Sequence, residues 1–171
     1  MNDHSTCTLP STYSRCRDYY HSKFKSSSRS NLNARWIMKR LKANSTIRYS
    51  FPVPSNSKFQ KTLDNKSLRK EFMDFLLKEH SSENLEFLID CQKLASMRRR
   101  NQCSKRAIKL YMKYFSDASP HELNVDRSTK CSTACKVAEC PSAESLNEAY
   151  LQTLILLQND AFGRFLSIYS S

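Results

Sequence analysis

Apolar side chains recur three and four positions apart along the last two thirds of the chain, which is the spacing of amphipathic helices. An early pair, Phe59 and Leu63, fits a helix at the start of this region. The alternation typical of strands is absent over any useful length. The positions that carry the helical pattern are Phe72, Phe75 and Leu76; Leu85, Leu88, Ile89 and Gln92; Ile108, Tyr111, Met112 and Phe115; Leu146, Ala149, Tyr150, Thr153, Leu154 and Leu157; and Phe162, Phe165, Leu166 and Tyr169.

This pattern predicts an all-α domain, and several breaks divide it into helices. The single glycine, Gly163, also argues against a sheet-rich fold with many tight turns. Pro120 forces the chain out of the preceding helix. The polar segment 127–145 is weakly periodic, so we expect only a loop or a short helical turn there. Ser142 is a workable start for the next helix. Asp160 is expected to cap the last helix or to favour its N-terminal dipole.

Composition separates this domain from a basic N-terminal extension. Residues 1–58 carry 11 Lys and Arg against Asp3 and Asp18, so they hold +9 of the total charge of +12. The extension is rich in Ser, Asn and Tyr and cannot bury enough apolar surface to offset its ordering entropy. We therefore expect a mostly flexible extension over 1–58 and a globular domain over 59–169.

The extension contains one amphipathic segment, residues 31–45. It is short for an independent helix, because helices below about 12–15 residues are marginal in water. On an anionic bilayer it can fold, and each basic group near such a surface contributes about 1 kcal/mol. The alternative is a solvated basic tail. The residues expected to contact the membrane are Trp36, Ile37, Lys39, Arg40 and Leu41.

Targeting signals and cysteines favour a cytoplasmic protein. No apolar stretch reaches 18 residues, and the N-terminus lacks the apolar core of a signal peptide. A mitochondrial-type leader is disfavoured because the amphipathic segment lies well inside the chain. The seven cysteines therefore suggest a reducing compartment. Cys131, Cys135 and Cys140 lie near His121 but fall outside the usual paired zinc spacings, so we expect thiols in a polar loop rather than a metal site.

Two other classes of function are disfavoured. A nucleic-acid-binding domain would carry a basic stripe with interleaved aromatic residues on a folded face, whereas the charge behind the pI of about 9.5 lies in the extension. An enzyme with chemistry of its own would need a phosphate loop, a metal site or a nucleophile with its base, and no such pattern occurs. No cofactor is expected.

A polar cluster at the start of one helix remains to be explained. Ser81, Ser82, Glu83 and Asn84 directly precede the apolar face that begins at Leu85. Ser81 or Ser82 can cap the helix, and Glu83 is favourable in its first turn. Capping does not require Asn84, which is a poor helix former. A binding surface would account for it.

Three separated motifs resemble the signature of regulator of G-protein signalling (RGS) domains. The segment 72–94 follows the family pattern Phe-x-x-Phe-Leu-x-x-Glu-x-Ser-x-Glu-Asn-x-x-Phe and then Cys. The segment 122–126 resembles the Val-Asn-Leu-Asp element, and 147–166 resembles the last helices. The matching residues are Phe72, Phe75, Leu76, Glu79, Ser81, Glu83, Asn84, Phe87, Cys91, Asn124, Asp126, Ala149, Leu156, Asp160, Phe162, Arg164, Phe165 and Leu166.

The resemblance implies a compact bundle of about nine helices that binds a GTP-bound Gα subunit, of the Gαi/o or Gαq class, and accelerates its GTP hydrolysis. A non-activating module that binds Gα or a receptor is the alternative, and the intact Asn84, Asn124 and Asp160 favour activity. Monomers are expected. The residues that the resemblance places at the Gα contact are Ser81, Glu83, Asn84, Asn124, Leu156, Asp160, Ala161 and Arg164. Singly, Leu156 could be core, Asn124 a turn residue, and Asp160 with Arg164 an i, i+4 pair.

Some positions depart from the family pattern. Leu88 stands where the family usually has Trp, Ala161 where it often has Ser, and the Cys-rich segment 131–140 differs most. The extension is similar to those of small RGS proteins that act at membranes. Cys7 and Cys16 are therefore candidates for palmitoylation, which would supply a second anchoring signal at the inner face of the plasma membrane.

Overall fold

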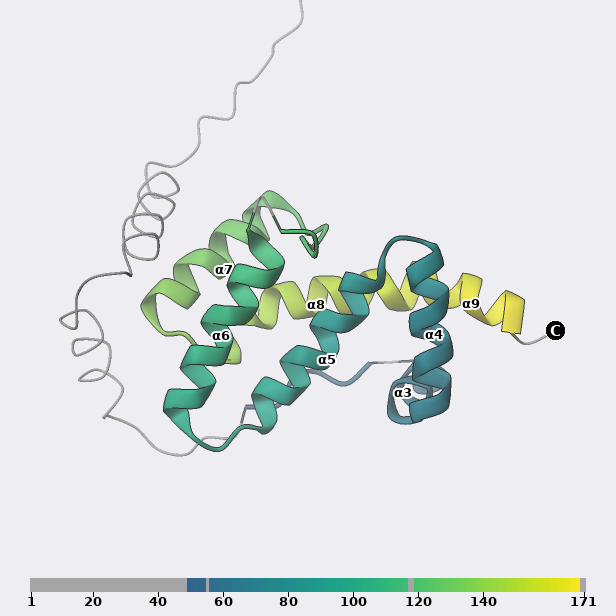
Figure 1. Ribbon diagram of the computed structural model, residues 1–171, viewed down its shortest axis with the longest axis horizontal. Helices are drawn as coiled ribbons and strands as arrows, with labels where there is room; N and C mark the ends of the chain where they lie inside the picture. Colours follow the sequence, from purple (N-terminus) through teal and green to yellow (C-terminus); the bar gives the residue numbers. More distant parts are fainter. Residues whose placement is uncertain (1–48, 55, 117–118, 170–171) are drawn as a thin grey trace, which may run out of the picture. The chain divides into compact units, whose positions relative to one another are not determined.

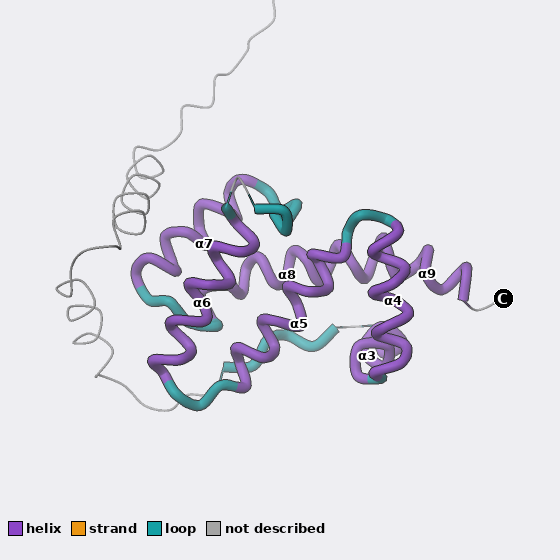
Figure 2. Tube along the Cα trace, in the orientation of Figure 1, coloured by secondary structure: helices purple, strands orange, loops and turns teal. Residues whose placement is uncertain are grey.

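The computed structural model describes residues 49–54, 56–116 and 119–169 (Figure 1). These ranges contain helices and no strand (Figure 2), which confirms the predicted all-α fold. The membrane segment 31–45 and the palmitoylation candidates Cys7 and Cys16 lie outside the described residues. The described ranges hold nine helical elements: α3 (Ser57–Asp64), α4 (Lys66–Lys78), α5 (Ser82–Ser96), α6 (Arg100–Phe115), α7 (Arg127–Glu139), the 3-10 helix η1 (Glu144–Leu146), α8 (Asn147–Leu156), the π-helix η2 (Leu157–Ala161) and α9 (Phe162–Tyr169).

Aromatic rings join the first and last helices of this bundle. Phe72 of α4 is fully buried and lies 6.0 Å from Phe59 of α3, measured between ring centroids. The rings of Phe162 and Phe165 in α9 lie 5.8 and 5.0 Å from that of Phe72. Aromatic pairs at such separations contribute beyond the area that they bury. This cluster holds the end of α4 beside α9, as Figure 1 shows.

A charged network joins α5 to α6 through Asp90. Its carboxylate accepts hydrogen bonds from Tyr114 Oη at 3.0 Å and from Arg106 Nη2 at 2.9 Å. Lys113 Nζ lies 3.7 Å away. Burial alone would raise the pKa of Asp90, but the Tyr114 hydrogen bond and the nearby cations outweigh burial and lower it. Burial first, and then the charge of Asp90 and the hydrogen bond to it, raise the pKa of Tyr114 well above its usual value. Asp90 therefore stabilises the fold as a carboxylate.

Asp90→Asn should lower the free energy of unfolding at pH 7 by about 1–2 kcal/mol, because charge-assisted hydrogen bonds become neutral ones. The folded-state pKa of Asp90 is depressed. Its contribution is thus present above the unfolded pKa of about 3.9 and is lost as the pH falls through the folded pKa. Urea unfolding of both proteins at several pH values checks this. A stability difference that stayed constant down to about pH 2 would contradict it.

Two helices differ from the sequence prediction. The segment 127–145 was expected to hold at most a short turn, yet α7 occupies 13 of its residues. Its buried side chains are Thr129, Thr133 and Val137, spaced i, i+4, i+8. Because two of them are threonines, an apolar pattern does not reveal this narrow stripe. Asp126 caps the helix by accepting from the Thr129 backbone N–H at 2.7 Å.

The buried face of α6 also lies one position away from the predicted one. Ala107, Leu110 and Tyr114 are its fully buried apolar residues, together with Phe115. Met112 was placed in the core, but it is 45% exposed. The predicted face, which included Met112, was wrong because alanine and tyrosine are only weakly hydrophobic. Ala107 and Tyr114 nevertheless pack in the core.

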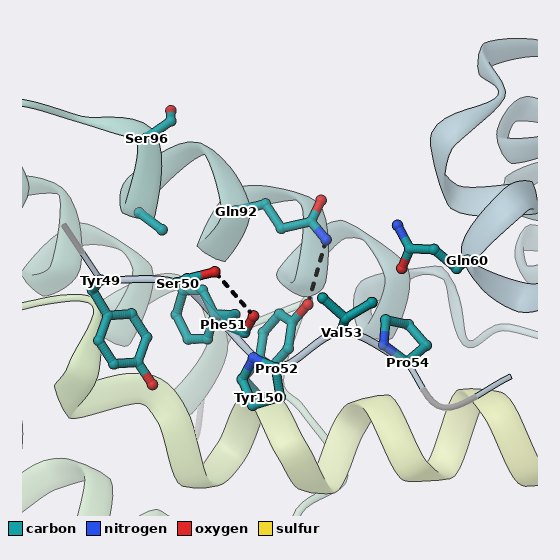
Figure 3. A pocket seen from close by; sticks show the side chains of 11 residues that line it. Tyr49, Ser50, Phe51, Pro52, Val53, Pro54, Gln60, Gln92, Ser96 and Tyr150 are labelled. Carbon is teal, nitrogen blue, oxygen red and sulfur yellow. Dashed lines mark hydrogen bonds between the residues drawn. The ribbon is translucent and has the colours of Figure 1, made fainter. Parts of the chain in front are cut away.

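Residues 49–54, within the predicted extension, pack against the domain (Figure 3). The ring of Phe51 is buried and stacks on Tyr150 of α8 with centroids 4.2 Å apart. Tyr150 Oη in turn accepts a hydrogen bond from Gln92 Nε2 of α5 at 3.4 Å. The chain therefore crosses both helices before α3 begins.

Candidate partner-binding site

The chain turns sharply between α4 and α5 at His80. The backbone of His80 has a φ of 53°, in the left-handed region that non-glycine residues rarely adopt. Its N–H donates to the Leu77 carbonyl at 3.2 Å, and the Ser81 N–H donates to the Leu76 carbonyl at 2.9 Å. These bonds form a Schellman motif, which satisfies the last carbonyls of α4. The turn places the polar cluster, residues 81–84, directly after the C-terminal end of α4.

The capping interpretation of this cluster was wrong for its serines. Ser81 occupies the N-cap position of α5 but makes no side-chain capping bond, and Ser82 is already the first helical residue. Ser81 Oγ is buried and has no hydrogen-bond partner among the described residues. Glu83 lies in the first turn, as expected. The cluster therefore has hydrogen-bonding groups that the start of the helix leaves unused.

Asn84 is the most buried member of the cluster, with 4% of its surface exposed. Its Nδ2 donates to the Ser81 carbonyl at 3.1 Å and to Glu83 Oε1 at 2.9 Å. Rotating the amide would set its oxygen against these two acceptors, so the orientation is fixed by the network. The opposite atom, Oδ1, is buried without a hydrogen-bond partner in the described part of the chain. An unpaired buried acceptor costs stability, so it marks a place where a partner's donor can bind.

The segment before α7 contributes Asn124. Leu123 and Val125 on either side of it are buried, whereas Asn124 and Asp126 are exposed. The Leu123 N–H donates to the Tyr114 carbonyl of α6 at 2.9 Å, which anchors the segment. Alternating burial thus points Asn124 outward from a fixed backbone.

The last helices run without a break through a π-helical turn, η2, between α8 and α9. Asp160 was expected to cap the last helix or to favour its N-terminal dipole, but it lies inside this turn, where the helix continues. Its carboxylate accepts from Arg164 Nη1. Arg164 also donates from Nε and Nη2 to the two carboxylate oxygens of Glu79, at 3.0 and 2.8 Å. These bonds, first to Glu79 and then to Asp160, raise the pKa of Arg164. A single guanidinium therefore bridges the end of α4 and the π-helical turn.

All the residues predicted for the contact line one surface depression of about 680 Å³. Sequence reasoning did not place four further lining residues there, Lys78, Glu79, His80 and Leu157. Glu79 was matched to a motif but not placed at the site, and His80 was not singled out. No sequence pattern predicts an ion pair between Glu79 and Arg164, because these residues lie 85 positions apart. The lining residues are Lys78, Glu79, His80, Ser81, Glu83, Asn84, Asn124, Leu156, Leu157, Asp160, Ala161 and Arg164.

The depression presents hydrogen-bond acceptors and an apolar side chain that a protein segment can contact. It offers amide and carboxylate acceptors from Asn84, Glu83 and Asp160 beside the partly exposed Leu156. Among the described residues, no group of three or more His, Cys, Asp or Glu side chains could hold a metal ion.

None of the helices in this part of the chain is long and apolar enough to cross a bilayer.

Comparison with known proteins gives consistent matches. Residues 58–169 match the family described as "Regulator of G protein signaling domain". The chain is 32% identical over 109 residues to regulator of G-protein signaling 19 from Bos taurus, covering 64% of this chain and 48% of that protein. It is 31% identical over 108 residues to regulator of G-protein signaling 8 from Danio rerio, covering 63% and 62%. The matched region thus spans less than two thirds of the length of these relatives.

Proposed function

This chain belongs to the regulator of G-protein signaling domain family, and on that basis we propose that it is a GTPase-activating protein for heterotrimeric Gα subunits. The partner would be the GTP-bound Gα of the Gαi/o or Gαq class, and the effect would be to attenuate receptor signalling. The basic extension, residues 1–58, would hold the protein at the anionic inner face of the plasma membrane.

One observation carries the proposal. Three segments that are far apart in the sequence converge on one depression, and at its base the buried Asn84 presents an acceptor with no partner among the described residues. Glu79 and Arg164 fix the opposite wall by a two-pronged ion pair. A preorganised polar surface of this kind can hold the flexible loops of a partner in one conformation.

The residues of the depression can accelerate GTP hydrolysis by Gα without donating a catalytic group. A Gα subunit supplies its own transition-state arginine in cis and its own water-positioning glutamine. A partner need only bind the hydrolysis-ready conformation more tightly than the ground state. Each tenfold in rate requires about 1.4 kcal/mol of such preference. Asn124 can both donate and accept around the switch backbone, Asp160 can accept from an amide or hydroxyl, and Leu156 supplies an apolar contact.

Single-turnover GTP hydrolysis by Gαi- and Gαq-class subunits tests the proposal. The wild-type protein should accelerate hydrolysis, and Asn124→Ala and Asp160→Ala should each reduce that acceleration by about tenfold or more. The matched controls are Asn101→Ala and Asp74→Ala, since both residues are exposed and lie outside the depression. The controls should keep full activity.

The outcomes separate the two candidate functions. No acceleration together with tight binding to a Gα loaded with a transition-state mimic would replace the activator by a non-activating binding module. Neither acceleration nor binding with any Gα would leave the family fold serving another function. Thermal unfolding of each variant ensures that a lost activity does not reflect a lost fold.

A further inference from the structure

Gln152 of α8 holds both hydrogen-bonding groups of its amide against one residue, Asp126. The Asp126 backbone N–H donates to Gln152 Oε1 at 3.1 Å, and Gln152 Nε2 donates to Asp126 Oδ2. These residues are 26 positions apart in the chain. Gln152 does not itself line the depression, but Asp126 lies two residues after Asn124 and Gln152 one helical turn before Leu156. The amide thus links the segments that carry two walls of the site.

Asp126 is also fixed by its own helix. Its Oδ1 accepts from Ser128 Oγ at 2.5 Å and from the Thr129 N–H at 2.7 Å. Its Oδ2 accepts from Thr129 Oγ1 at 3.1 Å. The Ser128 hydrogen bond first, then those of the Thr129 N–H and Gln152, keep the pKa of this carboxyl well below its usual range. Asp126 therefore stays ionised between about pH 5.5 and 8, and Gln152 faces a constant charge over that range.

We infer that Gln152 is a positioning residue for the proposed Gα contact: its amide, acting through Asp126, sets the placement of Asn124 relative to Leu156. This inference rests on the proposed function. The burial of Leu123 and Val125 fixes which way Asn124 points. This burial does not fix the end of the segment at Asp126. The two hydrogen bonds with Gln152 hold that end against α8.

The chemistry of the contact is specific for an amide. One atom must accept from a backbone N–H while another donates to a carboxylate, and among uncharged side chains the amides combine both groups in one plane. A lysine would only donate, and an ionised glutamate would only accept. A protonated glutamate can do both. Gln152→Glu therefore converts the contact into one that depends on pH.

The introduced carboxyl would face the ionised Asp126, with Glu148 one turn earlier on α8 and Lys136 of α7 paired to Glu148 at 2.7 Å. Repulsion from Asp126 and Glu148 raises its pKa above the usual value near 4.3, and Lys136 offsets part of that rise. The variant is thus neutral and able to donate at low pH, and it becomes ionised and repelled by Asp126 as the pH rises. Gln152→Glu should therefore lose the positioning of Asn124 as the pH rises.

The test measures GTPase acceleration as the ratio of Gln152→Glu to wild type, on the same Gα, between about pH 5.5 and 8. The ratio should fall about tenfold from the acid to the alkaline end. Gln102→Glu makes the same charge change at an exposed position of α6 and should give a constant ratio near one. A merely destabilised domain would lose thermal stability in parallel, so the unfolding midpoint of each protein is measured at each pH.

A second readout needs no Gα. Hydrogen exchange of the Asp126 amide, which donates to Gln152, should accelerate in Gln152→Glu at the alkaline end and stay slow in Gln102→Glu. If wild type accelerates no Gα, the proposed function fails. If wild type is active and Gln152→Glu matches it at every pH, or if the Asp126 amide is equally protected in both, the positioning role is overturned while the proposed function stands.

Discussion

Phe72→Ala should lower the free energy of unfolding by about 3–5 kcal/mol, the range for removing a fully buried phenylalanine. Phe72 is 0% exposed, and its ring lies within 6.3 Å of four other rings, those of Phe59, Phe75, Phe162 and Phe165. The neighbouring rings are rigid and come from three helices, so they cannot collapse into the space that the missing ring leaves. The cost should therefore lie at the upper end of the range.

Denaturant unfolding followed by far-ultraviolet circular dichroism measures this change. Leu77→Ala is the matched control, because Leu77 lies on the same helix and is 53% exposed. Its effect should stay within about 0.5 kcal/mol. A loss below about 1.5 kcal/mol for Phe72→Ala would mean that the aromatic cluster repacks, and the cluster could not then be what fixes α4 beside α9.

Much of the fold follows from helical spacing alone. The pattern at Phe72, Phe75 and Leu76 predicts a helix with that face inward, and all three are buried. The motifs around Ser81, Asn124 and Asp160 each gave residues that line the same depression. The resemblance to the RGS motifs therefore placed these residues together, and they do lie together because each motif is at the end of a helix or in a turn whose position the fold fixes.

What the sequence did not predict depends on contacts between distant residues or on unusual backbone. The π-helical turn at Asp160 adds a residue to the helix, and no periodic pattern reveals such an insertion. The bridge from Arg164 to Glu79 and the link from Gln152 to Asp126 join residues 85 and 26 positions apart. Each partner is an ordinary polar residue when taken alone. Only the packed structure shows that they meet.

Asn84→Asp should be the most damaging single-atom change at the site. The substitution replaces Nδ2, which donates to the Ser81 carbonyl and to Glu83 Oε1, with an oxygen that faces these two acceptors. A buried carboxyl that faces acceptors has a raised pKa. A rise of about three pKa units at about 1.36 kcal/mol each corresponds to a loss of about 4 kcal/mol at pH 7. GTPase acceleration should be abolished as well.

The pH dependence of this loss distinguishes a buried charge from a disturbed shape. Since the folded-state pKa of the introduced carboxyl is raised, the loss relative to wild type should be small below the unfolded pKa of about 3.9 and should grow as the pH rises from there to the folded pKa. Urea unfolding of both proteins from about pH 3 to 8 measures it. Asn101→Asp introduces the same charge at an exposed position and should change stability by less than about 0.5 kcal/mol at every pH. A loss for Asn84→Asp that is already complete at the lowest pH would show that Asn84 acts through its shape, and the network around its amide would then not be what holds the site ready for a partner.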